Sequence, residues 1–251
     1  MFSPASLKLD SPTPIDEILR KRYILIYLMI IFLSFLPISI FEYGFIFYLW
    51  RENIYWIFFL LIPFNIIIII YILQLGALFL SFLLLTICKL VYNPKEGIFQ
   101  RNIDDKNYRY WNLRNMIKKW PLFIMATNPF PWLKNRFTLR FFGVKIGKRT
   151  ICDNCWISSE FVEIGDNVII GMGTTILSFG IEQDKFIIKK IIIKNDTLIG
   201  AKCVLLPGTI MKKSAKLGVY SFTNYDSVLE ENSVYIGNPA KIKQKSVREN
   251  V

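Results

Sequence analysis

The sequence predicts a mainly β protein, a parallel β-solenoid with three short strands per turn that follows a pair of membrane-spanning α-helices. Two observations predict this fold: aliphatic residues recur every six positions through the last hundred residues, and the first ninety residues hold long apolar runs. A helix repeats near 3.6 residues and a strand near 2, so a period of six fits neither alone. It fits a solenoid in which each of three strands per turn points one aliphatic side chain into a narrow core.

The six-residue frame begins at Ile146 and is interrupted after Ile176. The first run of inward positions comprises Ile146, Cys152, Ser158, Ile164, Ile170 and Ile176. The second run comprises Ile187, Ile193, Ile199, Leu205, Met211, Leu217, Thr223 and Leu229. Four places after most of these stands a small or β-branched residue, which suits the corners of a narrow coil. Chance alternation in an ordinary sheet rarely sustains one frame this long, and the residues between the runs are expected to leave the coil as an excursion.

The composition indicates a membrane protein of a reducing compartment. Hydrophobic residues make up 53% of the 251 residues, which is high for a soluble domain. The formal net charge of +12 is explained by Lys and Arg that flank membrane spans on the cytoplasmic side and attract anionic lipid. Because no basic stripe with base-stacking aromatics is present, we expect no nucleic-acid partner. The four cysteines do not form the framework of a secreted disulfide protein.

Residues 1–22 are expected to be a polar tail, and residues 23–92 a transmembrane region. The apolar run 23–41 is long enough to cross about 30 Å of hydrocarbon. The second run, 54–90, is too long for one crossing, so either two helices turn at residues 74–76 or one span continues as a long or kinked helix. Basic residues precede the first run and follow the second. They favour two spans over three, with both termini and the solenoid in the cytoplasm.

Residues 93–143 are expected to connect the spans to the solenoid. Residues 108–119 mix aromatic and basic side chains in the manner of a helix that lies at the membrane surface, and the prolines that follow are expected to keep the chain irregular. This connector is either a gate that meets a lipid-borne substrate or an anchor that sets the height of the solenoid. The solenoid itself is expected over residues 144–242, and residues 243–251 are expected to be a C-terminal tail.

Three stretches of the repeat carry a resemblance to a known family. Residues Ile164–Gly171, Leu198–Ile210 and the closing Gly-Asn-Pro-Ala-Lys of Gly237–Lys241 resemble the hexapeptide-repeat acyltransferase superfamily, over about the last hundred residues. The resemblance implies a left-handed parallel β-helix and a homotrimer with active sites between neighbouring protomers. The order of two spans, a basic aromatic connector and one β-helix also resembles the membrane-bound C-terminal units of poly-amino-acid synthetases.

The family typically uses a histidine as general base, a role suited to a group that titrates near neutrality. By the resemblance that histidine would fall at or beside Phe179, where the chain leaves the coil, yet the sequence contains no histidine. The same absence argues against the related zinc enzymes, so no metal is expected. A buried carboxylate can serve as base instead, and a serine hydroxyl can donate a hydrogen bond to an oxyanion. The candidate catalytic residues are Glu160, Ser178, Glu182 and Asp184. The alternative is that all of them are solvated corner residues.

In relatives that use coenzyme A, backbone groups of the last coils and a nearby cation hold the donor. The corresponding positions are Ala201, Tyr220, Ser221 and Lys241. Tyr220 replaces a small residue and would narrow the groove for the pantetheine arm. The sequence therefore leaves three alternatives for the donor: acetyl-coenzyme A, a different thioester, or none. No tightly bound cofactor is expected.

The cysteines Cys152 and Cys155 form a CxxC pair, which alone is a weak signal for a metal site. Because Cys152 falls on the inward frame, we expect it to be a buried structural thiol. Cys203 occupies a small-residue corner and needs no other explanation.

The sequence thus predicts an enzyme that transfers an acyl or aminoacyl group from a thioester to a hydroxyl or amine close to the membrane. Its expected partners are copies of itself, membrane lipid and a small-molecule or lipid-linked acceptor. The competing interpretation is a catalytically inactive trimeric scaffold or membrane assembly protein. A third is a subunit that lends its spans to a transport path, for which Asn65 and Gln74 are the candidate lining residues.

Overall fold

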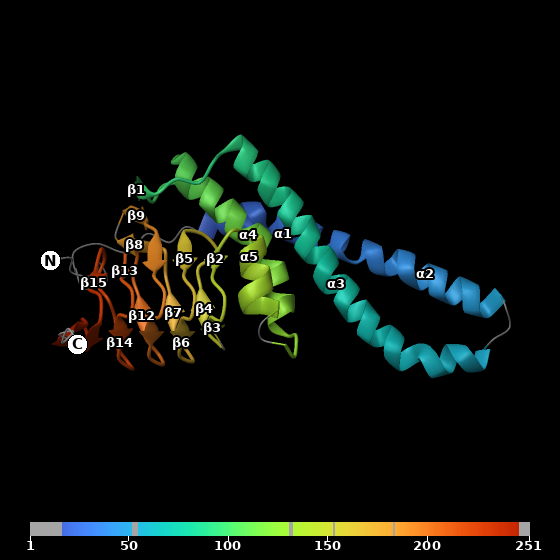
Figure 1. The fold of residues 1–251 in the computed structure, drawn as a ribbon. Coiled ribbons are helices and arrows are strands. Elements are labelled where there is room, and N and C mark those ends of the chain that lie inside the picture. Colours follow the sequence, from blue (N-terminus) through green and yellow to red (C-terminus); the bar gives the residue numbers. More distant parts are fainter. Residues whose placement is uncertain (1–16, 52–54, 131–132, 153, 183, 246–251) are drawn as a thin grey trace. The chain divides into compact units, whose positions relative to one another are not determined.

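The computed structural model describes residues 17–51, 55–130, 133–152, 154–182 and 184–245 of the chain (Figure 1). These residues form two compact units. The helical unit comprises residues 17–94 and 109–127, and the repeat unit comprises residues 95–108 and 128–245.

Three apolar helices make up most of the helical unit: α1 (Glu17–Ser34), α2 (Leu36–Arg51) and α3 (Tyr55–Val91). Two stretches, Tyr23–Trp50 and Tyr55–Val91, are long and apolar enough to cross a membrane. Many of their large apolar side chains are exposed within the unit, for example Phe32 and Ile40. Contiguous exposed apolar surface is rare on soluble monomers and suits contact with lipid. The prediction of two long apolar helices is confirmed.

Helix α3 runs without a break through residues 74–76, so the alternative in which the second run turns there is wrong. Gly76 serves close packing instead, because a Cβ placed on it would lie 3.4 Å from the ring of Pro37. Gln74 is used inside the unit, where its Nε2 donates a hydrogen bond to the Ile124 carbonyl oxygen over 3.2 Å. Asn65 likewise donates from Nδ2 to Oε1 of Glu42 over 2.8 Å. Neither residue therefore marks a transport path by itself.

The connector helix α4 (Lys106–Ala126) packs antiparallel along the second half of α3. Besides the Gln74 contact, Ser81 Oγ donates to the Ile117 carbonyl oxygen over 3.2 Å, and the rings of Tyr92 and Tyr110 stack at 4.8 Å. The expected helix at residues 108–119 is confirmed, and its position at a membrane surface stays a prediction. The helix also continues through Pro121, and a π-helix (Leu133–Thr138) and the short α5 (Leu139–Phe141) follow. The expectation of irregular chain is therefore wrong at Pro121 and over residues 133–141, whereas residues 127–130 form neither helix nor strand and Pro131 lies outside the described residues.

The repeat unit consists mainly of three sheets of parallel strands, stacked from β2 to β15 in Figure 1. The first sheet contains β2 (Lys145–Ile146), β5 (Val162–Ile164), β10 (Ile191–Ile193), β13 (Ile210–Met211) and β15 (Val228–Leu229). The second contains β3 (Ile151–Cys152), β6 (Ile169–Ile170), β11 (Leu198–Ile199), β14 (Lys216–Leu217) and β16 (Ser233–Ile236), with β17 (Lys241–Lys245) antiparallel at its end. The third contains β4 (Trp156–Ile157), β7 (Thr175–Ile176) and β12 (Val204–Leu205). The chain visits the three sheets in rotation, as a six-residue repeat requires.

The predicted inward frame forms the core of this stack. Every predicted inward residue is buried except Cys152, which is half-buried. Two assignments are corrected by the register. Ile157, not Ser158, pairs with Ile176, because the corner that begins after Cys152 is one residue shorter than the others. Ile187 lies in the excursion, and the coil resumes with β10.

The corners owe their shape to residues in the left-handed backbone region. Among the residues that the structure describes, ten non-glycine residues have positive φ: Arg149, Asn154, Phe161, Asn167, Asp196, Lys202, Ser214, Tyr220, Asp226 and Asn232. Most follow an inward residue by three positions, and several are Asn or Asp, which tolerate this region best. Glycine is required where successive corners touch, since a Cβ on Gly171 would lie 2.5 Å from the backbone nitrogen of Ala201. The recurrent Ile-Gly pairs of the sequence reflect this close approach.

The excursion is a hairpin of β8 (Phe179–Glu182) and β9 (Lys185–Ile188). A third strand, β1 (Gly97–Gln100), pairs antiparallel with β9, so a segment before α4 completes a small sheet beside the stack (Figure 1). Phe186 of β9 is fully buried, and its ring meets that of Tyr108 edge-on at 5.1 Å. The sequence predicted the excursion but not the strand that covers it.

Candidate functional site

The base of the excursion is an ordered polar junction. Ser178 lies two residues after the end of β7, is almost fully buried and donates from Oγ to the Glu160 carbonyl oxygen over 2.6 Å. Its backbone N–H donates to Oγ of Ser158 over 3.1 Å. These bonds tie together two successive corners at the end of the third sheet. The Ser178 hydroxyl proton is thus directed at protein backbone.

Lys189, which follows β9, bonds to the same junction. Its backbone N–H donates to the Ser178 carbonyl oxygen over 3.0 Å, and its Nζ forms an ion pair with Oδ2 of Asp226 at 2.5 Å. Asp226 belongs to a corner two circuits further along the chain than Ser178. The pair therefore fixes the hairpin against that later corner.

Phe179 stands where the resemblance places a catalytic base, and its ring meets Trp156 edge-on at 6.2 Å. The hydroxyl of Tyr225 lies against the next residue, Gly180. A Cβ built on Gly180 would lie 2.2 Å from that hydroxyl oxygen, so the phenol occupies the space that a side chain at position 180 would need. Burial raises the pKa of Tyr225, and the charge of Glu182 raises it further. The hydroxyl is therefore protonated at neutral pH and is a hydrogen-bond donor.

Of the three candidate carboxylates, the structure brings Glu182 to this hydroxyl. Side chains alternate between the two faces of a strand, so Glu182 projects from the same face of β8 as the Cβ direction of Gly180. Asp184 lies exposed at the hairpin turn, where its carbonyl oxygen accepts the Arg101 N–H over 2.6 Å. Glu160 is half-buried at the preceding corner of the third sheet.

The residues expected to hold a donor gather at a different corner, between the second and third sheets. Ala201 and Tyr220 follow β11 and β14, and the Tyr220 N–H donates to the Ala201 carbonyl oxygen over 3.0 Å. Ser221 is buried, and its Oγ accepts the Gly237 N–H over 3.0 Å. The Tyr220 ring is 61% exposed, and Nζ of Lys202 lies 5.3 Å from its centroid. Lys241 is exposed on β17, which pairs with β16 of the same sheet.

These two groups lie at opposite ends of the third sheet within one chain. Ser221 and Tyr225 are four residues apart, which corresponds to about 13 Å of extended chain. The donor and proton-handling candidates are thus separated by the width of one short sheet.

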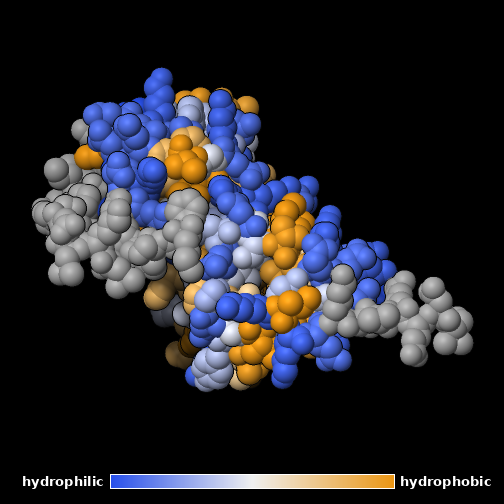
Figure 2. All heavy atoms as spheres, turned by 90° about the vertical axis from the view of Figure 1, so that its left-hand side faces the viewer, coloured by the Kyte–Doolittle hydropathy of each residue, from blue (hydrophilic) through white to orange (hydrophobic). Residues whose placement is uncertain are grey.

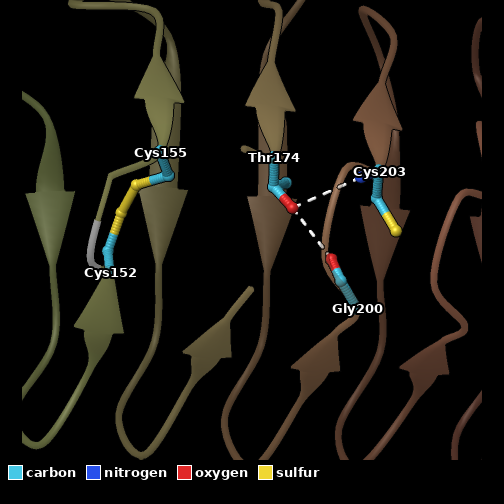
Figure 3. Close-up of a disulfide and its surroundings, with 5 residues drawn as sticks. All are labelled: Cys152, Cys155, Thr174, Gly200 and Cys203. Atoms are coloured by element: carbon cyan, nitrogen blue, oxygen red, sulfur yellow. Dashed lines mark hydrogen bonds between the residues drawn. A yellow bond between two sulfur atoms is a disulfide. The ribbon is translucent and has the colours of Figure 1, made fainter. Parts of the chain in front are cut away.

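The cysteines differ from the prediction. Cys152 and Cys155 form a disulfide across their corner (Figure 3), so the expected buried thiol at Cys152 is wrong. The two Cα atoms lie 6.0 Å apart, a normal separation for a disulfide that a tight corner brings about. Cys203 is buried, and burial raises the pKa of its thiol, which makes it a poor nucleophile. Figure 3 shows Thr174 beside it, donating to the Gly200 carbonyl oxygen and accepting the Cys203 N–H.

Charge elsewhere on the repeat unit is arranged in surface pairs. Glu163 contacts Nζ of both Lys145 at 2.6 Å and Lys190 at 2.9 Å, and hydrogen bonds from these lysines lower its pKa. Within the described residues, no group of three or more His, Cys, Asp or Glu side chains is placed to hold a metal ion. Figure 2 views the side on which β15 lies in Figure 1 and shows a mostly hydrophilic surface with separate hydrophobic patches.

Two curated proteins are similar to this chain, and no family model matches it. Delta-poly-L-ornithine synthetase of Acinetobacter baumannii (strain AB307-0294) is 24% identical over 135 residues, which are 53% of this chain and only 10% of the synthetase. YvoF of Bacillus subtilis (strain 168), by provisional assignment an acetyltransferase, is 29% identical over 123 residues, which are 47% of this chain and 70% of YvoF.

Solved structures of hexapeptide-repeat enzymes share part of the fold at low identity. The acetyltransferase VCA0836 of Vibrio cholerae is 18% identical, with a TM-score of 0.45, over 51% of this chain and 88% of that one. A maltose O-acetyltransferase of Clostridium difficile 630 is 17% identical, with a TM-score of 0.44, over 60% of this chain and 92% of that one. At these TM-scores the likenesses decide nothing about this chain's activity. The repeat motifs and the curated relatives agree, and over about half its length this chain resembles the hexapeptide-repeat acyltransferases.

Proposed function

We propose that this protein is a membrane-anchored hexapeptide-repeat acyltransferase. It moves an acyl or aminoacyl group from a thioester to a hydroxyl or amine of an acceptor close to the membrane. The observation that carries this function is the pairing of Glu182 with the Tyr225 hydroxyl on one face of β8, in the excursion that begins where the resemblance places the family's base. The similarity to the Bacillus acetyltransferase supports the same reaction class.

We infer that the three sheets wind as a left-handed β-helix, as the repeat motifs imply, and that three copies associate. An apolar column on the outer face of the second sheet supports association. Ile151, Ile169 and Leu198 stand in register on β3, β6 and β11, and they are 53%, 45% and 40% exposed. A second copy would remove this surface from water.

The two apolar stretches would hold the repeat unit at the membrane, with both termini and the repeat unit on the cytoplasmic side. The basic residues that flank these stretches support that orientation. A cytoplasmic repeat unit has access to coenzyme A thioesters, while its acceptor is presented by the membrane or near it. A lipid-linked or small-molecule acceptor fits this placement.

Within the site, Glu182 is the best-placed base, because it lies beside Tyr225. Glu160 and Asp184 are the alternatives, at the preceding corner and at the hairpin turn. Ser178 positions this junction through its bond to the Glu160 backbone. Ala201, Tyr220, Ser221 and Lys241 would hold acetyl-coenzyme A or another thioester, and the exposed Tyr220 ring narrows the place available to it.

The test is thermal stabilisation of the detergent-solubilised full chain by acetyl-coenzyme A and by free coenzyme A, together with a mass measurement of the assembly. A ligand that binds only the folded state must raise the melting temperature. A saturable rise with either compound is expected. No rise at saturating ligand would reject a coenzyme A donor and favour the inactive scaffold, for which the aromatic pair of Phe179 and Trp156 at the family's base position is the supporting observation.

A further inference from the structure

The Tyr225 hydroxyl is held at one defined place on the excursion. It lies against the backbone of Gly180 in β8, at a separation that leaves no room for a Cβ. The residue after it, Asp226, is fixed by the ion pair with Lys189 at 2.5 Å and by its N–H, which donates to the Pro207 carbonyl oxygen over 3.1 Å. The phenol is half-buried. This corner is therefore anchored on both sides, to the hairpin and to the preceding circuit.

The groups at this place have complementary proton chemistry. A tyrosine that stays protonated offers one strong donor, and a carboxylate oxygen such as that of Glu182 can accept a hydrogen bond. Acyl transfer needs both: a donor at the carbonyl oxygen, where negative charge develops, and an acceptor for the proton that the attacking hydroxyl or amine loses. The hydroxyl of Ser178 cannot supply the donor while it is bonded to the Glu160 carbonyl oxygen.

We propose that Tyr225 is a catalytic residue whose hydroxyl donates a hydrogen bond to the thioester carbonyl oxygen, while Glu182 receives the acceptor's proton. This inference rests on the proposed function and adds to it the residue that stabilises the oxyanion. Tyr225 needs to touch only the acyl carbonyl, so either the same copy or a neighbouring copy can hold the rest of the donor.

The step balances as follows. The acceptor oxygen or nitrogen attacks the carbonyl carbon, and its proton moves to the Glu182 carboxylate. The carbonyl oxygen gains charge and is stabilised by the Tyr225 hydroxyl, which keeps its proton. When the tetrahedral intermediate collapses, the C–S bond breaks and the departing thiolate takes the proton from Glu182. The products are the acylated acceptor and the free thiol, with both side chains restored.

The test compares dissociation constants for acetyl-coenzyme A and coenzyme A, measured by calorimetry on the detergent-solubilised full chain and its variants. If the hydroxyl contacts the acyl carbonyl, the wild-type protein binds acetyl-coenzyme A more tightly than coenzyme A, by about fivefold for one neutral hydrogen bond. Tyr225→Phe is expected to lose this preference while its affinity for coenzyme A is unchanged. Tyr235→Phe is the matched control, because it also removes a tyrosine hydroxyl from the repeat unit, one that accepts the Glu230 N–H over 3.1 Å.

Gly180→Ala is a second variant, since its methyl group would displace the phenol without removing the hydroxyl. It is expected to lose the preference as well. Retention of the preference in Tyr225→Phe, or equal wild-type affinity for the two compounds, would overturn the role of Tyr225 and leave the donor site standing. Should Tyr225→Phe fail to fold, retention in Gly180→Ala overturns it in the same way. If the wild-type protein binds neither compound, the coenzyme A form of the proposed function fails, and the role of Tyr225 fails with it.

Discussion

Replacing Ser178 by alanine tests whether its hydroxyl has a structural or a catalytic role. The hydroxyl is almost fully buried and bonded to the Glu160 carbonyl oxygen at 2.6 Å, so Ser178→Ala removes that hydrogen bond. Removing one partner of such a bond costs about 1–3 kcal/mol, depending on how far water can replace it. For a domain of about 150–250 residues, each kcal/mol lowers the melting temperature by about 2–4 °C. We therefore expect a decrease of about 2–12 °C.

The assay is thermal unfolding of the detergent-solubilised full chain, followed by intrinsic fluorescence, with coenzyme A affinity measured on the same samples. Ser227→Ala is the control, because Ser227 is a half-buried corner serine of the same repeat unit. We expect the control to change the melting temperature much less than Ser178→Ala, and both variants to bind coenzyme A like the wild-type protein. An unchanged melting temperature in Ser178→Ala, combined with loss of the preference for the acylated compound, would refute this reasoning and make the hydroxyl an oxyanion donor.

Three further predictions concern the repeat unit. Leu205→Ala should destabilise it by about 3–5 kcal/mol, since Leu205 is fully buried, whereas Val228→Ala at a 45% exposed outward position should cost less than about 1 kcal/mol in the same unfolding assay. The lowered pKa of Glu163 gives the wild-type protein extra stability above the usual pKa of a free glutamate, and this stability is lost as the pH falls through the lowered pKa. Glu163→Gln should therefore lower the melting temperature at neutral pH, and the melting temperatures of the two proteins should converge in acid. Leu198→Lys should shift the assembly towards monomer in a mass measurement, and an unchanged trimer would exclude the second sheet as the contact face.

The regular part of the repeat unit could be predicted because its physical constraint is local. Each inward position needs an aliphatic side chain and each corner a small one, so the frame is visible in any window of two circuits. The predicted six-residue frame was wrong at two places, where the spacing between inward residues differs from six. The short corner after Cys152 moved the inward position to Ile157, and the hairpin took Ile187 out of the coil. Apolar residues also point inward in a hairpin, so composition alone does not separate the two cases.

The candidate site was predicted less completely, because its parts meet through the stacking of distant circuits. Glu182 and Ser178 were predicted from their place at the interruption of the repeat, and their catalytic roles stay predictions. Tyr225 was missed, since the circuit that carries it adjoins the excursion only after folding. Gly180 could have indicated this contact, because a glycine inside a strand often marks a place where another group approaches closely. The disulfide was missed for a different reason, because the inward frame argued for a buried thiol.

Because the sequence contains no histidine, the proton acceptor must be another residue, and its identity decides where the reacting centre lies. If the proton acceptor is Glu182 rather than a residue at position 179, the reacting centre lies three residues further along β8, towards the hairpin turn. There Glu182 faces Lys185, and Lys185 in turn faces Gln100 of β1. The acceptor would then bind beside a strand that comes from the segment between α3 and α4 in the sequence. Acceptor specificity would then be carried by that segment as well as by the repeat.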